Sequence, residues 1–205
     1  MFITEELRKL LEQQRERMAE CVFRTMLEKG KLRFLIISDD LKWTFPPDIK
    51  IEPGSRRLAQ KNNTPLKRSL FDQVPEDDFN ETEKAVAWYL EGQEQLFFWF
   101  RNRARIDYAI QGWRQHRIFP DFIFTAATDD AADDYTWVYV VETKGMHLKD
   151  NERTQYTRRL FDICTEKAQS RKWNEFGHEM KDKVLRFEVL TEVEWKAKLN
   201  ELLQS

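Results

Sequence analysis

Cysteine is scarce in this sequence: Cys21 and Cys164 are the only two, and they lie in different predicted elements. Such a pair indicates two free thiols in a reducing compartment, because a disulfide framework needs more cysteines at regular spacing. The three histidines, His116, His147 and His178, are widely separated. Their spacing excludes an HxxxH motif and a Cys/His zinc motif.

Long hydrophobic runs are also missing. No stretch approaches 18 consecutive apolar residues, so we predict no membrane-spanning helix. The N-terminus, MFITEELRKLLEQ, lacks the basic-then-apolar pattern of a signal peptide. We therefore expect a cytoplasmic protein without a membrane partner. With 205 residues, 41% of them hydrophobic, the chain is long and apolar enough for one folded domain and a small appendage.

Net charge is small, but the charges are unevenly distributed. The total is −2, from 34 basic and 36 acidic residues. Between Trp99 and Arg117 only Asp107 is acidic, whereas the segment holds five arginines: Arg101, Arg103, Arg105, Arg114 and Arg117. The segment 144–172 holds eight bases and four acids, and four aspartates lie within 129–134. This distribution indicates an anion-binding face beside an acidic loop; scattered solvated charges are the alternative.

The first 78 residues have a different character from the rest. Apolar residues at helical spacing (Leu7, Leu11, Met18, Val22) predict a helix from Thr4 to Gly30 with one face packed on another part of the protein. Residues 31–37 read as a strand. Five of the six prolines lie in 38–78, which we expect to be irregular. We therefore divide the chain into a helix, strand and proline-rich connector region, 1–78, and a main domain, 79–205.

The main domain shows a regular succession of periodic segments. Helical spacing predicts helices over 80–91, capped by Asn80, and over 149–171, and a capping box of Thr191 and Glu194 predicts a last helix. Apolar runs and alternation predict strands over 96–100, 105–112, 119–124, 135–143 and 183–190. The expected fold class is α/β (α+β), with a mixed central sheet flanked by helices.

Two carboxylates and a lysine lie in or next to two strands that we predict to be adjacent in the sheet. If 119–124 and 135–143 form a hairpin, in-register pairing places Asp121 opposite Glu142. Side chains alternate along a strand, so Lys144 shares a face with Glu142 while Thr143 takes the other. Opposed carboxylates repel unless positive charge lies between them. A divalent cation supplies it, and oxygen ligands without His or Cys select Mg²⁺ or Mn²⁺.

The alternative is ordinary surface charge, since an Asp followed by Glu-x-Lys is common. Both acids, however, lie in apolar strands, where an unpaired charge is costly. Pro120-Asp121 followed by Glu142-Thr143-Lys144 resembles the PD-(D/E)xK nuclease superfamily. The predicted element order resembles its restriction-endonuclease-like αβββαβ core, with one extra strand and an N-terminal helical and irregular extension.

A longer resemblance supports this one. The ordered segments NETEKAVAWYLEG, FFWFRN, GW, FPDFIF and VVETKG are similar to the C-terminal nuclease region of type III restriction endonuclease Res subunits and related helicase–nuclease proteins, over roughly residues 70–170. The resemblance implies an Mg²⁺-dependent DNA endonuclease of a restriction or antiviral defence system, with Mn²⁺ able to substitute. It implies that Asp121, Glu142, Glu83 and the Thr143 carbonyl hold the metal and that Lys144 positions the attacking water. Glu81 competes with Glu83 for that role, and a solvated helix acid is the alternative.

The same resemblance suggests DNA contacts. Arg101, Asn102 and Arg103 match a W-x-R-N stretch of these relatives, although surface arginine is the alternative. The helix after Glu-x-Lys often supplies a polar residue to the active site, and Gln155 and Tyr156 are the candidates here. Thr157 replaces the lysine usual after that tyrosine, which puts the role of the helix in doubt. His147 lies close enough to Lys144 to touch substrate, or is structural. We expect Trp113 and Trp137 to belong to the core.

The chain contains no GxxxxGK[ST] phosphate loop. Because the resembling proteins join their nuclease to an ATP-driven motor, we expect a helicase or translocase domain or subunit as partner. Cutting both strands would require two active sites, hence a possible homodimer. Two other functions stay open: a degenerate nuclease fold that binds DNA or assembles a complex, and a repair exonuclease of the same superfamily.

Overall fold

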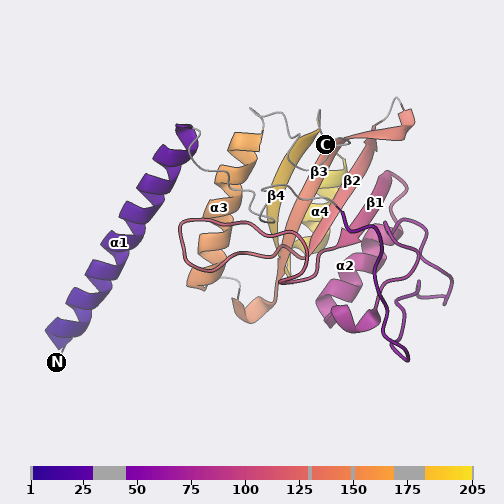
Figure 1. Cartoon of the computed structure of the whole chain (residues 1–205), viewed down its shortest axis with the longest axis horizontal. Helices are drawn as coiled ribbons and strands as arrows, with labels where there is room; N and C mark the ends of the chain where they lie inside the picture. Colours follow the sequence, from indigo (N-terminus) through magenta and orange to yellow (C-terminus); the bar gives the residue numbers. More distant parts are fainter. Residues whose placement is uncertain (1, 30–44, 129–130, 149–150, 169–182, 205) are drawn as a thin grey trace.

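The computed structural model describes residues 2–29, 45–128, 131–148, 151–168 and 183–204. These residues form a mixed α+β fold with a four-stranded sheet and four α-helices (Figure 1). The helices are α1 (Phe2–Glu28), α2 (Glu81–Glu91), α3 (Glu152–Ala168) and α4 (Trp195–Leu203), and the strands are β1 (Leu96–Arg101), β2 (Phe122–Thr128), β3 (Ala131–Lys144) and β4 (Val184–Thr191). Two short 3-10 helices, η1 (Glu76–Asp78) and η2 (Met146–Leu148), complete the described elements. The strand predicted over 31–37 lies outside the described residues.

The sheet has the strand order β1-β2-β3-β4. Neighbours β1, β2 and β3 are antiparallel, whereas β4 runs parallel to β3 because the chain returns through α3. Phe122 pairs with Val141 and Ile123 with Val140. Asp121 directly precedes β2, and its N–H donates to the Val141 carbonyl at 2.8 Å, which places it next to Glu142 at the end of β3 although the paired residues stop at Phe122.

Side-chain alternation gives the sheet two apolar faces, each covered by a separate cluster. Val138 and Val140 belong to the cluster that includes residues of α3, of the segment 108–118 and of the end of α1. Tyr139 and Val141 belong to the cluster with α2, α4 and the segment 58–79. The sheet is therefore the middle of three layers, and we name its sides the α3 face and the α2 face.

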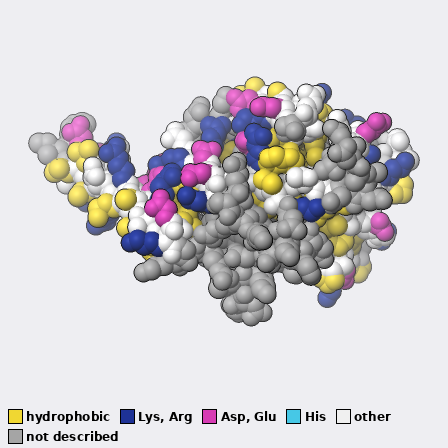
Figure 2. Space-filling view, turned by 90° about the horizontal axis from the view of Figure 1, so that it is seen from above, with side chains coloured by type: hydrophobic (Ala, Val, Ile, Leu, Met, Phe, Trp, Pro, Cys, Tyr) yellow, Lys and Arg dark blue, Asp and Glu magenta, His cyan; other side chains and the backbone are white. Residues whose placement is uncertain are grey.

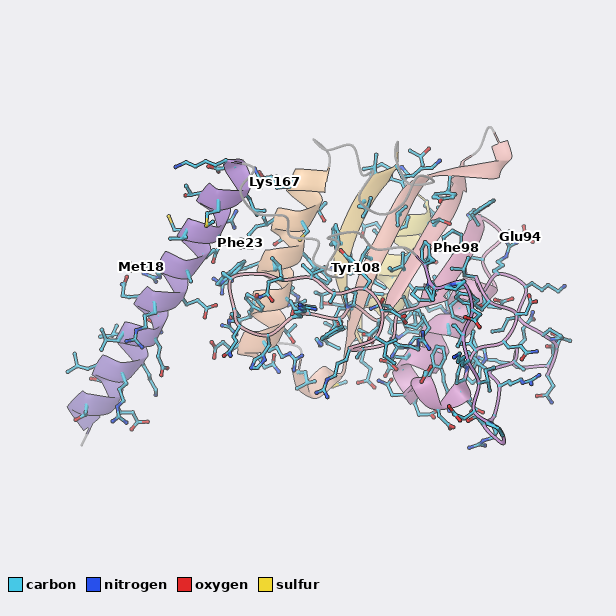
Figure 3. All side chains as sticks on the ribbon, in the orientation of Figure 1. Met18, Phe23, Glu94, Phe98, Tyr108 and Lys167 are labelled. Atoms are coloured by element: carbon cyan, nitrogen blue, oxygen red, sulfur yellow. The ribbon has the colours of Figure 1, made fainter. Side chains whose placement is uncertain are left out.

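Among its described residues, helix α1 buries apolar side chains only near its C-terminal end, although Glu16 in its middle pairs with Arg114 at 2.7 Å. Phe23 and Leu27 are buried there. Leu11 and Met18 are 59% and 67% exposed, so the predicted packing of one whole apolar face is wrong for this part of the helix. In Figure 3 Phe23 points toward α3 and Met18 points away. Figure 2 shows the N-terminal part of α1 projecting from the body with apolar side chains on its surface.

Over its described part, 45–78, the proline-rich segment is irregular as predicted, except for the 3-10 helix η1 at its end. It nevertheless packs on the sheet: the Leu70 N–H donates to the Trp99 carbonyl and the Trp99 N–H to the Arg68 carbonyl. The buried Glu91 carboxylate accepts hydrogen bonds from the Trp99 indole at 2.9 Å and from the Arg68 N–H at 3.1 Å. This segment covers the free edge of β1 and shares a hydrophobic cluster with residues beyond the predicted boundary at 78/79.

Two local predictions about helix starts have different outcomes. The capping box of α2 is confirmed, because Asn80 Oδ1 accepts from the Glu83 N–H and Glu83 Oε2 accepts from the Asn80 N–H, both at 2.9 Å. The capping box at Thr191 is wrong. Thr191 is the last residue of β4, and its hydroxyl donates to the Glu194 side chain at 2.8 Å, so that α4 begins at Trp195 with Glu194 as its N-cap.

The strand predicted over 105–112 is also wrong. Residues 102–121 instead form a long connection that runs in front of the sheet toward α3 and back (Figure 1). Ile106 is 70% exposed, so the alternation that suggested a strand does not correspond to one buried face. Arg105 has φ 68°, a left-handed conformation that a strand does not allow. Only an isolated antiparallel bridge joins Ile110 to Ile118.

Candidate active site

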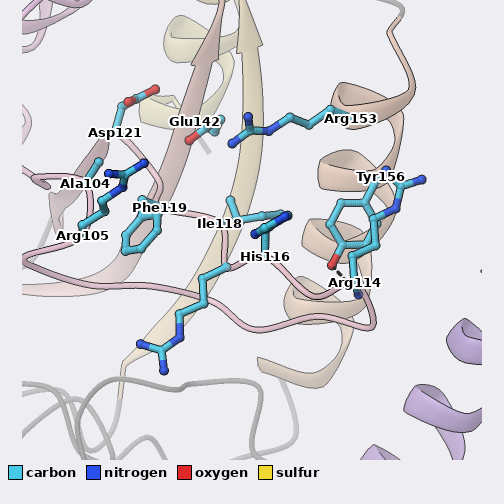
Figure 4. Close-up of a pocket in the computed structure, with 11 residues that line it drawn as sticks. Ala104, Arg105, Arg114, His116, Ile118, Phe119, Asp121, Glu142, Arg153 and Tyr156 are labelled. Atoms are coloured by element: carbon cyan, nitrogen blue, oxygen red, sulfur yellow. Dashed lines mark hydrogen bonds between the residues drawn. The ribbon is translucent and has the colours of Figure 1, made fainter.

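Asp121 and Glu142 lie side by side where β2 begins and β3 ends. Strand parity places both on the α3 face, and both line one cleft (Figure 4). Lys144 is two residues beyond Glu142, and its ammonium donates to Glu142 Oε1. The predicted sharing of a face by Glu142 and Lys144 is therefore confirmed.

The Glu142 carboxyl is buried and only half satisfied. Its side chain is 8% exposed, and Oε1 is bound by Lys144. Oε2 is buried and has no hydrogen-bond partner among the described residues. Burial, reinforced by the nearby Asp121 charge and opposed by Lys144, raises the pKa of Glu142 to about 8. Glu142 thus has one oxygen that lacks a donor or a cation.

The Asp121 carboxylate, in contrast, is fully engaged. Oδ2 accepts from the Thr143 N–H at 2.6 Å and from the Thr143 hydroxyl at 2.7 Å. Oδ1 forms an ion pair with Arg101 Nη1 at 3.1 Å. These bonds fix the carboxylate at the end of the sheet, where it reaches residues of both faces.

Arg101 is the buried cation that joins this cluster. Its Nη2 binds Glu83 Oε1 at 2.8 Å, and its Nη1 also donates to the Asp121 carbonyl at 2.7 Å. The guanidinium lies 5.4 Å from the Phe79 ring centroid and 5.2 Å from that of Phe122. Because its donors are occupied inside the protein, this position differs from the surface phosphate contact that we predict from sequence.

Arg101 and Lys144 also change the argument for a metal. The sequence suggests that a divalent cation must offset the repulsion between Asp121 and Glu142. In the structure each carboxylate already has a cationic neighbour, Arg101 for Asp121 and Lys144 for Glu142. The case for a metal must therefore rest on the unsatisfied oxygen of Glu142.

Glu83 lies on the α2 face, away from Glu142. Its carboxylate receives the Asn80 N–H and the Arg101 guanidinium, and burial raises its pKa. Among the described residues no group of three or more His, Cys, Asp or Glu side chains is arranged to hold a metal ion. Glu83 nevertheless lies beside Asp121, since the Asp121 carboxylate adds to the rise in the Glu83 pKa and both acids bind Arg101. Its competitor Glu81 has a side chain that is 90% exposed and pairs with Lys84.

Asn102 and Arg103 stabilise the connection 102–121. The Asn102 amide donates to the carbonyls of Tyr108 (2.9 Å) and Pro120 (2.7 Å), and its oxygen accepts the Tyr108 N–H. Arg103 binds the Asp107 carboxylate at 2.8 Å. Asn102 is almost completely buried, so it holds the two ends of the connection together and presents no amide to DNA.

Helix α3 contributes Arg153 and Tyr156 to the cleft. The Tyr156 hydroxyl accepts the Arg114 N–H at 3.2 Å, and its buried ring packs edge-on against Trp113. Gln155 is exposed and does not line the cleft, and Thr157 is buried. His147 lies in η2, but its side chain is outside the described part of the chain. The core positions predicted for Trp113 and Trp137 are confirmed, since both pack against the hydrophobic clusters.

The cleft above the two acids has a volume of about 620 Å³. Its remaining lining is mainly basic and comes from the connection 102–121 and from α3: Arg105, Arg114, His116, Arg117 and Arg153 (Figure 4). The excess of basic residues in 99–117 and 144–172 is the signal in the sequence for this lining. Sequence motifs instead select Arg101 and Arg103, which bind internal carboxylates.

No family model, curated protein or solved structure matches this chain. In the part of the chain that the structure describes, no helix combines the length and apolar character needed to cross a bilayer.

Proposed function

We propose that this protein is an Mg²⁺-dependent nuclease that hydrolyses phosphodiester bonds of DNA, with the αβββαβ elements from α2 to β4 acting as a restriction-endonuclease-like core. The observation that carries the proposal is the Glu142 carboxyl. One of its oxygens is buried without a partner, its other oxygen binds Lys144, and Asp121 lies beside it at the base of a basic cleft. If Glu142 served only to stabilise the fold, a buried carboxyl oxygen without a hydrogen-bond partner at the base of a cleft would be unfavourable.

These residues fit a hard divalent cation. Carboxylate and carbonyl oxygens are its preferred ligands, and Mg²⁺ is commonly held by one or two carboxylates, with water and substrate phosphate completing the shell. Glu142, Asp121 and the Thr143 carbonyl would hold it. Glu83, whose carboxylate also receives the Asn80 N–H and Arg101, lies beside Asp121 and would complete this set. A bound Mg²⁺ would supply Lewis-acid stabilisation of charge on the phosphate.

The chain's own residues provide the remaining chemistry. Lys144 lies next to Glu142, where its ammonium can orient the attacking water and stabilise negative charge on the phosphate. Arg101 and Thr143 hold the Asp121 carboxylate in place, so that it needs little reorganisation to act. The cleft arginines offer donors to the phosphates on either side of the reacting one.

Incubation of the full chain with supercoiled plasmid, linear duplex and single-stranded DNA tests the proposal, in Mg²⁺, Mn²⁺ or EDTA. We expect metal-dependent cutting by the wild type and none by Asp121→Ala or Lys144→Ala, with Glu81→Gln as the matched control. Retained cutting by Asp121→Ala would overturn the site. Cutting restricted to linear DNA would indicate the exonuclease alternative.

A second candidate function, DNA binding or assembly without catalysis, is favoured by the engagement of both Asp121 oxygens. The two functions differ in metal binding. A Mn²⁺ titration by calorimetry should show heat with the wild type and none with Glu142→Gln if the protein is a nuclease. Mn²⁺ binding without cutting would fit a nuclease that needs its expected motor or a second copy.

A further inference from the structure

We propose that Arg105, Arg117 and Arg153 form a phosphate clamp that holds one nucleic-acid strand across the cleft. The proposal rests on the proposed function for the identity of the reacting bond, but it concerns binding and can be tested without catalysis. It assigns the substrate-backbone contacts to three arginines outside the motifs that suggest a nuclease.

These three arginines differ from the others nearby because they form no ion pair with a described carboxylate. Arg101, Arg103 and Arg114 each form ion pairs, with Asp121, Asp107 and Glu16 respectively. Within the described ranges no carboxylate pairs with Arg105, Arg117 or Arg153, although all three line the same cleft. Arg153 acts on a carboxylate without forming an ion pair, because its charge opposes the rise in the Glu142 pKa. Cations that line one cleft without an ion-pair partner indicate an anionic ligand.

The three side chains come from two walls of the cleft. Arg105 and Arg117 belong to the connection 102–121, and Arg153 belongs to the first turn of α3. In Figure 4 the guanidinium of Arg153 points toward Glu142, and Arg105 lies on the opposite side, near Phe119 and Asp121. Arg105 and Arg153 therefore lie on different sides of the acid pair, as contacts to successive phosphates of one backbone would require.

The connection that carries Arg105 and Arg117 is anchored at several points. The Arg103 N–H and guanidinium bind the Asp107 carboxylate around the left-handed Arg105, at 2.9 and 2.8 Å. Farther along, Gly112 packs so closely on α3 that an added Cβ would lie 2.8 Å from Leu160 Cδ2. These contacts fix the spacing between the walls, so the arginines are held in position before a ligand binds.

The chemistry of the cleft favours a phosphodiester strand over a single small anion. Guanidinium groups bind phosphate oxygens through two parallel hydrogen bonds. The carboxylates of Asp121 and Glu142 at the base would repel an isolated anion, whereas a strand can place its flanking phosphates on the arginines. The volume of about 620 Å³ lies in the range of sites that enclose drug-sized ligands, roughly one or two nucleotides.

Fluorescence anisotropy of a labelled 12-nucleotide oligo-dT tests the clamp, with the full chain in EDTA at a series of salt concentrations. Each phosphate contact contributes about 0.7 to the slope of log K against log salt for a single strand. We expect Arg105→Gln, Arg117→Gln and Arg153→Gln each to reduce the slope by about 0.7, and the triple variant by about 2. The control Arg8→Gln removes an exposed charge on α1 and should leave the slope unchanged.

Unchanged slopes in the three cleft variants would overturn the clamp, as would tighter binding of a 12-base-pair duplex that depends on the same arginines. Thermal unfolding verifies that the glutamine variants are folded; all three sites are exposed, so we expect no loss. The outcomes separate the two proposals. Arginine-dependent binding with neither Mn²⁺ binding nor cutting in any metal refutes the nuclease and keeps the clamp, whereas cutting with unchanged slopes refutes the clamp and keeps the nuclease.

Discussion

Replacing Glu142 by glutamine should change how the stability of the protein depends on pH. The carboxyl has a pKa of about 8 in the folded state because it is buried, against an ordinary value of 4.5. Between these two values the folded protein keeps a proton that the unfolded chain has released. The free energy of unfolding must therefore fall as the pH rises from about 4.5 to about 8. Below pH 4.5 the carboxyl is protonated in both states, so it no longer makes the free energy of unfolding depend on pH.

The size of the effect follows from the same two values. Each pH unit inside the window lowers the free energy of unfolding by about 1.4 kcal/mol. The whole interval from 4.5 to about 8 then corresponds to about 5 kcal/mol, and the part above pH 5.5 to about 3 kcal/mol. Since domains have total stabilities of about 5–15 kcal/mol, this contribution is large enough to measure. Glu142→Gln imitates the protonated carboxyl but cannot ionise, so it removes this pH-dependent contribution to the free energy of unfolding.

Urea unfolding in EDTA at pH 5.5 and pH 8 measures this difference. We expect the wild type to lose about 3 kcal/mol more than Glu142→Gln between the two pH values. Glu81→Gln, which alters an exposed acid, should behave as the wild type. Equal losses in the wild type and Glu142→Gln would refute the reasoning, because they would show that Glu142 ionises in the folded protein as freely as in the unfolded chain. Added Mg²⁺ should restore stability at pH 8 in the wild type alone.

Three further substitutions test the packing around the site by urea unfolding. Arg101→Gln should cost about 3–5 kcal/mol, because it leaves the buried carboxylates of Glu83 and Asp121 without their cation. Gly112→Ala should cost about 1–3 kcal/mol, because the new methyl group would overlap the side chains of α3. Leu27→Ala should cost about 2–5 kcal/mol, because it opens a cavity where α1 is buried against the body.

Each substitution has a matched control from a less constrained position. Arg105→Gln removes an exposed arginine and should alter stability by less than about 0.5 kcal/mol. Gly92→Ala adds a methyl group with no contact closer than 3.6 Å. Leu11→Ala truncates a leucine that is 59% exposed on α1. A control that costs as much as its partner would mean that the contact we name is not the source of the effect.

The sequence predicts most of the helices and strands, because the spacing of apolar residues and the capping of helices depend on residues close in sequence. The helix starting after Asn80 and the hairpin that brings Asp121 next to Glu142 are correct, since a capping box and a hairpin involve residues close in sequence. The hairpin is not in register throughout, because it contains irregularities between Ala126 and Thr128. The strand expected at 105–112 fails for a non-local reason. Asn102 draws Tyr108 and Pro120 together through its side chain, and this bends the segment away from the sheet.

The candidate site is predictable in its acids but not in its cations. Motif spacing locates Asp121, Glu142 and Lys144, because adjacent strands place them together. It cannot show that Arg101 turns to the α2 face and pairs with Glu83, since this depends on how α2 packs. Nor does it show that Arg153 faces the cleft. Tertiary packing determines which arginines of a basic segment form ion pairs with carboxylates and which do not.

The contacts that build the site have consequences for how the chain folds. Arg101 bonds to Asp121 across 20 residues, and Thr143 bonds to Asp121 across 22. No short fragment contains the whole arrangement, because three strands must pair before the acids acquire their partners. Loop closure of this kind is slower than the formation of a helix. During synthesis the nascent chain therefore carries no assembled site until β3 has left the ribosome, and a chain released earlier would lack it altogether.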